Sequence, residues 1–210
     1  MKHIELLLER YPALTVCEDA IRSAVEAIIG AYENGGKLLL CGNGGSCADC
    51  DHIAGELMKG FLKKRPLPEA LRSEMQARCH ALDDGIFSKL QGGLPAISIP
   101  QQTALGTAFA NDQEPRRAFA QATLSLGRAG DALMAISTSG NAENVVLAAK
   151  VAKGLGMTVL ALTGEGGGAL AEIADVSVCV PARETFMAQE LHLPVYHAIC
   201  AEIENAEFDI

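Results

Sequence analysis

The sequence has no tryptophan, and aromatic residues make up only 4% of its 210 positions. No apolar run approaches eighteen residues, which argues against a membrane-spanning helix. Positive charge is also scarce, since 17 lysines and arginines face 26 acidic residues and give a net charge of −9. A field of that sign repels nucleic acids and anionic membranes, so we expect neither as a partner. A small anionic ligand is still compatible, because backbone N–H groups can hold it locally.

Seven cysteines are scattered through apolar segments, and this odd number does not suit a framework of disulfides. The first ten residues mix charges with leucines and show no secretory cleavage pattern. We therefore expect reduced thiols and a cytoplasmic protein. Cys47 and Cys50 form a C-x-x-C pair at a predicted helix start, where thiol pKa values fall, so a redox or metal-binding module is one alternative.

Apolar residues make up 49% of the chain, enough for the core of a single domain over residues 1–210. Short apolar runs alternate with helical patterns, which predicts an α/β fold with a parallel sheet covered on both faces. The predicted strands are 38–41, 94–99, 132–136, 157–162 and 176–180. The predicted helices are N-terminal helices within 1–34 broken at Pro12, then 47–61, 103–110 ended by Asn111-Asp112, 116–127, 142–155, 169–174 and a C-terminal helix at 184–206. Residues 63–93 are predicted to form a helical insert.

Two polar turns each follow a predicted strand. The first reads Gly-Asn-Gly-Gly-Ser (42–46) and the second Ser-Thr-Ser-Gly-Asn (137–141). Hydroxyls and free N–H groups at a helix start suit a phosphomonoester, and the carboxyl ends of parallel strands are where such sheets bind ligands. The first turn is not G-x-G-x-x-G and lacks the lysine of a P-loop, so we expect no nucleotide cofactor. The structural alternatives are a simple tight turn and an N-cap cluster.

Four polar side chains on two predicted helices have the spacing of a site. His52 and Glu56 lie four residues apart on one helical face, and Gln189 and His197 lie eight apart on the last helix. Together they could hold zinc through nitrogen and oxygen atoms, or His52 and Glu56 could form an acid/base pair. The alternative is a partly buried histidine bonded to its neighbour.

Other polar residues of the last helix have a simpler interpretation. His192, three residues after Gln189, is interpreted as a polar position on an otherwise apolar helix. Glu202 and Glu204 are interpreted as part of a solvated face. The apolar stripes of the N-terminal helices need a cover, which either the core or a subunit partner would supply.

Several motifs occur together. They are Gly-Asn-Gly-Gly-Ser at 42–46, Asp-x-x-His-x-x-x-Glu at 49–56, Asn-Asp at 111–112, Ile-Ser-Thr-Ser-Gly-Asn at 136–141 and Gln-Glu-x-His-x-x-x-x-His at 189–197. In combination they resemble the sugar isomerase (SIS) domain family, and within it the phosphoheptose isomerases, over about residues 21–203.

The resemblance implies a flavodoxin-like αβα sandwich with N-terminal helices, assembled as a homotetramer with active sites between subunits. It implies conversion of a ketoheptose 7-phosphate to an aldose through an enediol, with Glu56 as the base and His197 as the acid. The implied substrate-binding residues are Asn43, Gly44, Gly45, Ser46, Asn111, Asp112, Ser137, Thr138, Ser139 and Gln189, with the phosphate held by Ser46 and by residues 137–139. The implied zinc ligands are His52, Glu56, Gln189 and His197.

The chain departs from the family pattern at three places. Ala142 stands where a serine is frequent, Gly60 stands where an arginine is frequent, and the 63–93 segment is longer than in compact members. Ala142 removes one hydroxyl expected at the phosphate. The alternative function is a non-catalytic SIS protein that binds a sugar phosphate or a protein, like the relative that associates with the bacterial replication initiator.

Overall fold

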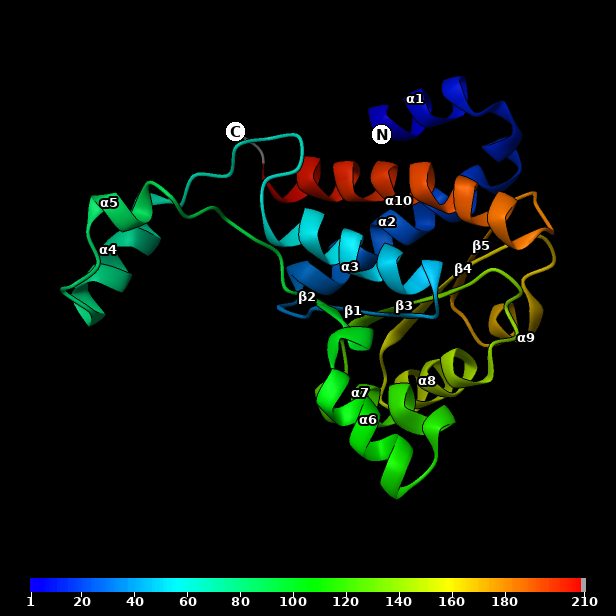
Figure 1. The fold of residues 1–210 in the computed structure, drawn as a ribbon. Helices are drawn as coiled ribbons and strands as arrows, with labels where there is room; N and C mark the ends of the chain where they lie inside the picture. Colours follow the sequence, from blue (N-terminus) through cyan, green and yellow to red (C-terminus); the bar gives the residue numbers. More distant parts are fainter. Residues whose placement is uncertain (209–210) are drawn as a thin grey trace.

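A five-stranded parallel sheet forms the centre of the computed structural model, which describes residues 1–208 (Figure 1). The strands are β1 Leu38–Gly42, β2 Ala96–Ser98, β3 Ala132–Ser137, β4 Thr158–Thr163 and β5 Val176–Cys179. Their order is β2-β1-β3-β4-β5, and every neighbouring pair is parallel. All five predicted strands are confirmed. The order is that of flavodoxin-like sheets.

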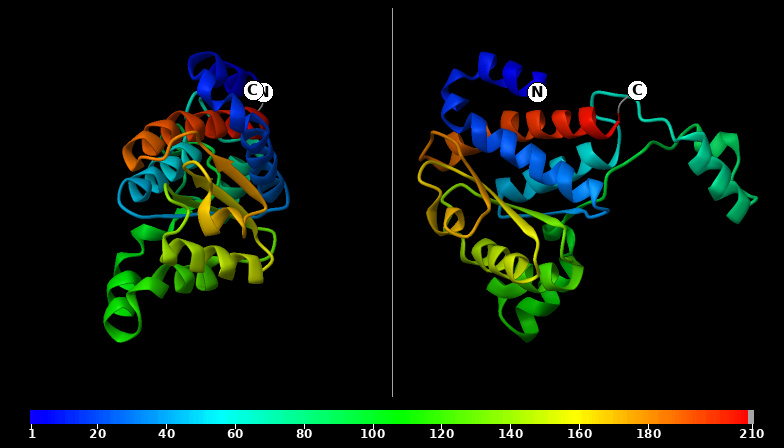
Figure 2. Two further views of the ribbon diagram at one scale, coloured as in Figure 1. Left: turned by 90° about the vertical axis from the view of Figure 1, so that its right-hand side faces the viewer. Right: turned by 180° about the vertical axis from the view of Figure 1, so that it is seen from behind.

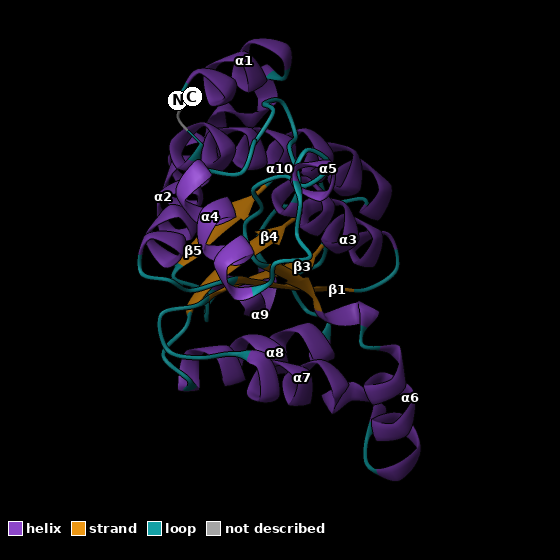
Figure 3. Ribbon diagram, turned by 90° about the vertical axis from the view of Figure 1, so that its left-hand side faces the viewer, coloured by secondary structure: helices purple, strands orange, loops and turns teal. Residues whose placement is uncertain are grey.

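Helices cover both faces of the sheet because successive strand residues point to opposite sides. Leu38 and Leu40 of β1 pack into one buried cluster, and Leu39 and Cys41 pack into the other. The first face carries α2 Glu18–Glu33, α3 Gly45–Met58 and α10 Thr185–Glu207, with α1 Lys2–Arg10 lying outside them on α10. The second face carries α6 Thr103–Asp112, α7 Ala118–Leu126, α8 Glu143–Gly154 and α9 Gly168–Ala171. Figures 2 and 3 show the sheet between these two layers.

The N-terminal helices are covered by this chain's own core. Ile4, Leu7 and Leu14 are almost fully buried, and α1 packs along α10. Pro12 starts a short 3-10 turn, Pro12–Cys17, that separates α1 from α2 as predicted. No helix among residues 1–208 has the length and apolar character needed to cross a bilayer.

Two predicted boundaries near residues 99 and 111 are wrong. The strand predicted at 94–99 ends at Ser98, because Pro100, which lacks an N–H, belongs to the 3-10 turn Ile99–Gln101. Asn111 and Asp112 do not stop α6 but form its last two residues. The Asn111 Nδ2 donates to Asp112 Oδ1 at 2.8 Å, so these side chains bond to each other and do not compete with the helical backbone. Another 3-10 turn, Pro115–Arg117, precedes α7.

The predicted insert is a helical arm, here defined as residues 66–91. It holds α4 Glu69–Arg78 and the single turn α5 Asp84–Phe87, whose N–H of Ile86 is capped by Asp83 Oδ1 at 2.9 Å. No residue of α4 is buried. Figures 1 and 2 show both helices standing away from the body on two extended links.

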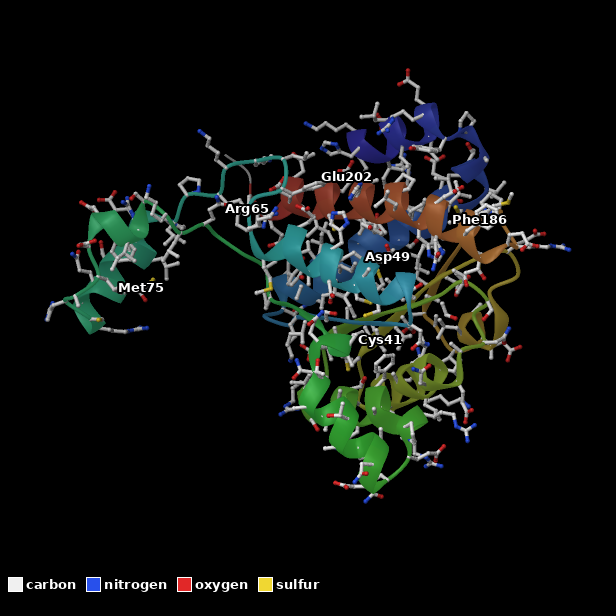
Figure 4. The ribbon with its side chains drawn as sticks, viewed as in Figure 1. Cys41, Asp49, Arg65, Met75, Phe186 and Glu202 are labelled. Carbon is white, nitrogen blue, oxygen red and sulfur yellow. The ribbon has the colours of Figure 1, made fainter. Side chains whose placement is uncertain are left out.

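The interpretation of Glu202 and Glu204 as solvated residues is wrong. Glu204 is 1% exposed and accepts hydrogen bonds from the backbone N–H groups of residues 61–63 and from Arg65 Nε at 2.8 Å. Arg65 also donates to the carbonyl of Leu57 at 2.7 Å, so it closes the end of α3. Glu202 accepts from the N–H of His3 at 2.6 Å at the start of α1. Figure 4 shows Arg65 and Glu202 at α10.

Candidate active site

A hollow of about 360 Å³ lies where β1 and β3 end. From β1 the chain crosses to β2 on one side, and the connection to β3 returns to the other side, so this is the switch point of the sheet. The hollow is lined by Asn43, Gly44, Gly45, Ser46, Ile136, Ser137, Thr138, Ser139, Ala142, Thr185 and Gln189. Both predicted turns therefore meet in one place, as the parallel topology required.

Three helix N-termini contribute to the hollow, which gives it free N–H groups and the positive ends of three dipoles. They belong to α3, α8 and α10. Gly44 has φ of +55°, which lets the chain turn sharply into α3. A Cβ on Gly45 would stand 2.5 Å from Gln189 Nε2, so the missing side chain is what brings α10 close to this turn. This arrangement can hold a phosphate without any basic side chain.

Asn43 has a partner that the sequence did not reveal. Its Nδ2 donates to Asn144 Oδ1 at 2.9 Å, and Asn144 Nδ2 donates back to Asn43 Oδ1 at 2.8 Å. This pair ties the first turn, whose Asn43 lines the hollow, to α8. Thr185, the first residue of α10, was also missed, although a hydroxyl residue at a helix start was an available signal.

A second group of polar side chains lies farther along α3. His52 Nε2 is 3.4 Å from Glu56 Oε1 and 3.4 Å from His197 Nε2. Glu56 Oε2 also accepts from Lys59 Nζ at 2.9 Å. Burial, and then the neighbouring His52, lower the pKa of His197, so its imidazole is neutral near pH 7. The predicted carboxylate and its two histidines are thus brought together, ready to move protons.

Behind His52 lie two residues that the sequence analysis did not assign to the site. The Tyr196 hydroxyl is 3.0 Å from His52 Nδ1 and 3.2 Å from Asp49 Oδ1. Burial raises the pKa of the Tyr196 phenol, which therefore keeps its proton. Burial also raises the pKa of Asp49, although the Tyr196 hydrogen bond and His52 act in the opposite direction.

Three predicted site residues do not join this group. Gln189 lies at the Gly45 turn, near the start of α3 rather than near His52. Asn111 and Asp112 lie exposed at the end of α6 on the other face of the sheet and do not line the hollow. His192, interpreted as a simple polar position, is fully buried, and burial lowers its pKa to about 4.

The predicted zinc set is incomplete in this arrangement. The two 3.4 Å separations around His52 match the edge of a ligand tetrahedron about zinc, whose nitrogen ligands lie at about 2.0–2.1 Å. However, no three His, Cys, Asp or Glu side chains among residues 1–208 form a group that could hold a metal ion. Side chains would have to turn, and Gln189 would have to move, before zinc could bind.

The Cys47–Cys50 pair lacks the lowered thiol pKa values that are typical of reactive cysteines. Both thiols are free, Cys50 is fully buried, and burial raises its pKa well above the ordinary value. Burial and then Asp51 raise the pKa of Cys47 as well. The expected lowering of thiol pKa at this helix start is therefore wrong, and a redox module finds no support here.

The departures from the family pattern have local consequences. Ala142 lines the hollow and offers it no hydroxyl. Gly60 donates its N–H to Gln91 Oε1 at 2.7 Å, and a Cβ there would overlap the Lys63 carbonyl, so an arginine does not fit in this backbone.

Comparison with known proteins agrees with this geometry. The family model described as SIS domain matches residues 7–84 and 72–164. The phosphoheptose isomerase of Roseiflexus sp. (strain RS-1) is 36% identical over 189 residues, which cover 90% of this chain and 83% of that protein. The chain belongs to the SIS domain family.

Two solved structures align with this SIS domain over nearly its full length. The phosphoheptose isomerase of Neisseria gonorrhoeae has a TM-score of 0.75 at 32% identity and covers 97% of this chain and 96% of its own. The phosphoheptose isomerase from Francisella tularensis has a TM-score of 0.76 at 30% identity, covering 97% and 95%. The predicted flavodoxin-like α/β sandwich of the SIS domain is confirmed.

Proposed function

We propose that this chain is a sugar-phosphate isomerase that converts sedoheptulose 7-phosphate to the aldose heptose 7-phosphate. The observation that carries the proposal is the arrangement along α3. Ser46, in the first turn of α3, lines the hollow of about 360 Å³, and Glu56 lies ten residues farther, about 15 Å along the helix axis. A substrate anchored by its phosphate would therefore extend its far end toward the carboxylate. The similarity to phosphoheptose isomerases supports this choice of sugar.

The residues divide the reaction between binding and proton transfer. The N–H groups of three helix starts and the hydroxyls of Ser46, Ser137, Thr138 and Ser139 hold the phosphate. The Glu56 carboxylate removes the proton at one of the two reacting carbons and returns it to the other, so the intermediate is an enediol. His197, whose lowered pKa keeps it neutral, moves the proton of the sugar oxygen.

Glu56 gives the direct test of this mechanism. Glu56→Gln keeps the shape of the side chain but removes the base, so turnover should fall by about 10²–10⁴-fold. Binding of the sugar phosphate, measured by calorimetry, should persist, because the hollow lies at the other end of α3. Glu26→Gln, at an exposed position of α2, is the matched control and should retain full activity. Full activity of Glu56→Gln would refute the mechanism.

The zinc site is also a proposal. Bound at His52, Glu56, Gln189 and His197, zinc would polarise a sugar oxygen, and no step above depends on it. Zinc added after chelation should raise the melting temperature of the wild type and not that of His52→Ala. An equal rise of the melting temperature in both proteins, or no rise in either, would refute a zinc site at these residues.

We propose further that the protein works in the cytoplasm as a homotetramer with active sites between subunits. Free cysteines support a reducing compartment. A second hollow, of about 370 Å³, places His197 beside the partly exposed apolar side chains of Leu6, Leu62 and Leu193, a surface that a subunit would cover. Light scattering that gave the mass of a monomer at assay concentration would refute the assembly.

A screen of five- to seven-carbon sugar phosphates, with and without chelator, separates this function from its rival. Turnover of sedoheptulose 7-phosphate is the expected result. If sugar phosphates raise the melting temperature but none is converted, the chain is a binding member of the family, which Ala142 in the hollow would favour.

A further inference from the structure

Tyr196 and Asp49 form a hydrogen-bonded chain with His52 that the proposed mechanism does not use. Tyr196 is 1% exposed and lies on α10, and Asp49 lies one turn before His52 on α3. Figure 4 shows Asp49 between the two helices. The phenol oxygen stands 3.2 Å from Asp49 Oδ1 and 3.0 Å from His52 Nδ1, so one hydroxyl connects a carboxylate to an imidazole.

Counting protons decides the direction of these two hydrogen bonds. The phenol has one proton to donate, and an ionised carboxylate can only accept. The other oxygen of Asp49, Oδ2, is buried and has no hydrogen-bond partner among residues 1–208. The Tyr196 proton therefore belongs in the bond to Asp49, because a buried carboxylate without any donor would be costly. The phenol oxygen is then left as an acceptor, and His52 Nδ1 must carry the proton that it accepts.

We propose that Asp49 and Tyr196 are positioning residues that hold His52 as the Nδ1–H tautomer, with the lone pair of Nε2 turned toward Glu56 and His197. The tautomer follows from the hydrogen-bond geometry together with an ionised Asp49 carboxylate. Its importance for turnover rests on the proposed function.

The tautomer determines what the two other side chains can do. A bare His52 Nε2 accepts a hydrogen bond from His197 Nε2–H across their 3.4 Å separation. It gives no hydrogen bond to Glu56 Oε1, also 3.4 Å away, so that oxygen is free to take a proton from the substrate. In the opposite tautomer, Nε2–H would point at Glu56 and weaken the base. Removing an outer group that orients a metal-ligating histidine costs about 10–100-fold in metal affinity or activity, and we expect a loss of activity of similar size here.

The tautomer can be observed directly by NMR. The chain has five histidines, so protein labelled with ¹⁵N only in histidine gives a simple long-range ¹H–¹⁵N spectrum, and His52→Asn identifies the His52 signals. At about pH 8.5, two units above the usual histidine pKa, a neutral imidazole shows one protonated and one bare nitrogen. We expect His52 Nδ1 to be the protonated nitrogen in the full-length wild-type protein. Nε2 protonation would overturn the proposal, whatever the protein's activity.

Two variants test the chain from either end. Asp49→Ala removes the acceptor of the phenol proton, so Tyr196 should donate to His52 Nδ1 and move the histidine proton to Nε2. Tyr196→Phe keeps the buried ring but removes the oxygen, so the Nδ1–H signal should weaken. Asp51→Ala is the matched control. It removes a carboxylate from the same helix, but this carboxylate accepts hydrogen bonds from Ser98 and Gln101 and not from Tyr196.

Activity gives the second readout. If the chain is an isomerase, Tyr196→Phe should lower kcat by about 10–100-fold with KM nearly unchanged, because the phosphate hollow is untouched. An unchanged His52 tautomer in both Asp49→Ala and Tyr196→Phe, with intact circular dichroism, would overturn the positioning role. An inverted tautomer in a protein that converts no sugar would support the positioning role and refute only the isomerase.

Discussion

Glu204 is the residue whose replacement tests the packing of α3 against α10 most sharply. Its buried carboxylate is paired with buried Arg65 at 2.8 Å and accepts hydrogen bonds from the N–H groups of Phe61, Leu62 and Lys63. Burial alone would raise the pKa of Glu204, but the backbone N–H groups of Phe61 and Leu62 and the Arg65 side chain overcome it and hold the pKa below the ordinary value. Glu204→Gln keeps one oxygen that can accept some of these hydrogen bonds, but it leaves the buried Arg65 charge without its partner.

The expected loss of stability is large. Breaking a buried ion pair by removing one partner costs about 3–5 kcal/mol. For a chain of 150–250 residues, each kcal/mol lowers the melting temperature by about 2–4 °C, so Glu204→Gln should melt about 6–20 °C below the wild type. Circular dichroism in thermal and urea unfolding measures both quantities. Because the folded-state pKa is lowered, the advantage of the wild type should be complete above the ordinary carboxyl pKa and should shrink as the pH falls below it.

Glu74→Gln supplies the matched control. It breaks the Arg78–Glu74 contact, whose side chains are 81% and 64% exposed, and exposed pairs contribute about 0–1 kcal/mol. Its melting temperature should fall by only a few degrees. Equal shifts for Glu204→Gln and Glu74→Gln would show that the buried pair does not stabilise this fold, and the reasoning above would be wrong.

Three further changes have expected outcomes. His192 is buried and its pKa is lowered to about 4, so the stability of the wild type should fall as the pH drops from about 6.5 toward 4. His192→Leu should flatten this pH dependence of the unfolding free energy, measured with urea. The same pH dependence in both proteins would refute the burial argument. Replacing Cys47 and Cys50 with alanine should leave turnover unchanged, because burial keeps both thiols protonated; lost activity would restore a role for them. Gly140→Ala should lower the melting temperature and abolish phosphate binding, because the φ of Gly140 is +65° and a Cβ would overlap a neighbouring carbonyl. Gly30→Ala, in open space within α2, should instead stabilise the protein by about 0.5–1 kcal/mol. Equal effects of the two substitutions on the melting temperature would contradict this reasoning.

The parts of the site that sequence could predict are those built by neighbours in the chain. The apolar run 38–41, the glycine turn and the amphipathic segment after it specify a strand, a turn and a helix locally. The alternation of strands and helices then required a parallel sheet, so the turns at 42–46 and 137–141 had to reach the same edge. The structure confirms both steps.

The parts that sequence did not predict depend on how α3 packs against α10. The Tyr196 hydroxyl meets Asp49 across 147 positions of the chain, and Arg65 meets Glu204 across 139. No local pattern signals such a contact. Glu204 also resembles a solvated charge when only its helix is considered, because its partners come from a loop far away in the sequence.

The placement of Gln189 shows a limit of helical spacing as a guide. Residues eight apart share a helical face but lie about 12 Å apart along the axis. Because α3 and α10 run side by side in the same direction, Gln189 meets Gly45 while His197 meets His52. The shared helical face therefore placed Gln189 and His197 on the same side of the site, but too far apart in this arrangement to bind one metal ion together.

The arm leaves and rejoins the body at a single point, because the N–H of Gly92 donates to the carbonyl of Arg65 at 2.7 Å. The two ends of the arm are thus held together, and the arm is a closed loop attached to the core. Changing the length of such a loop alters mainly its closure entropy, which grows slowly with length. The arm can therefore be lengthened, replaced or shortened during evolution without shifting the register of the sheet. Such changes would alter the surface that the arm offers to partners and leave the packing of α3 against α10 unchanged.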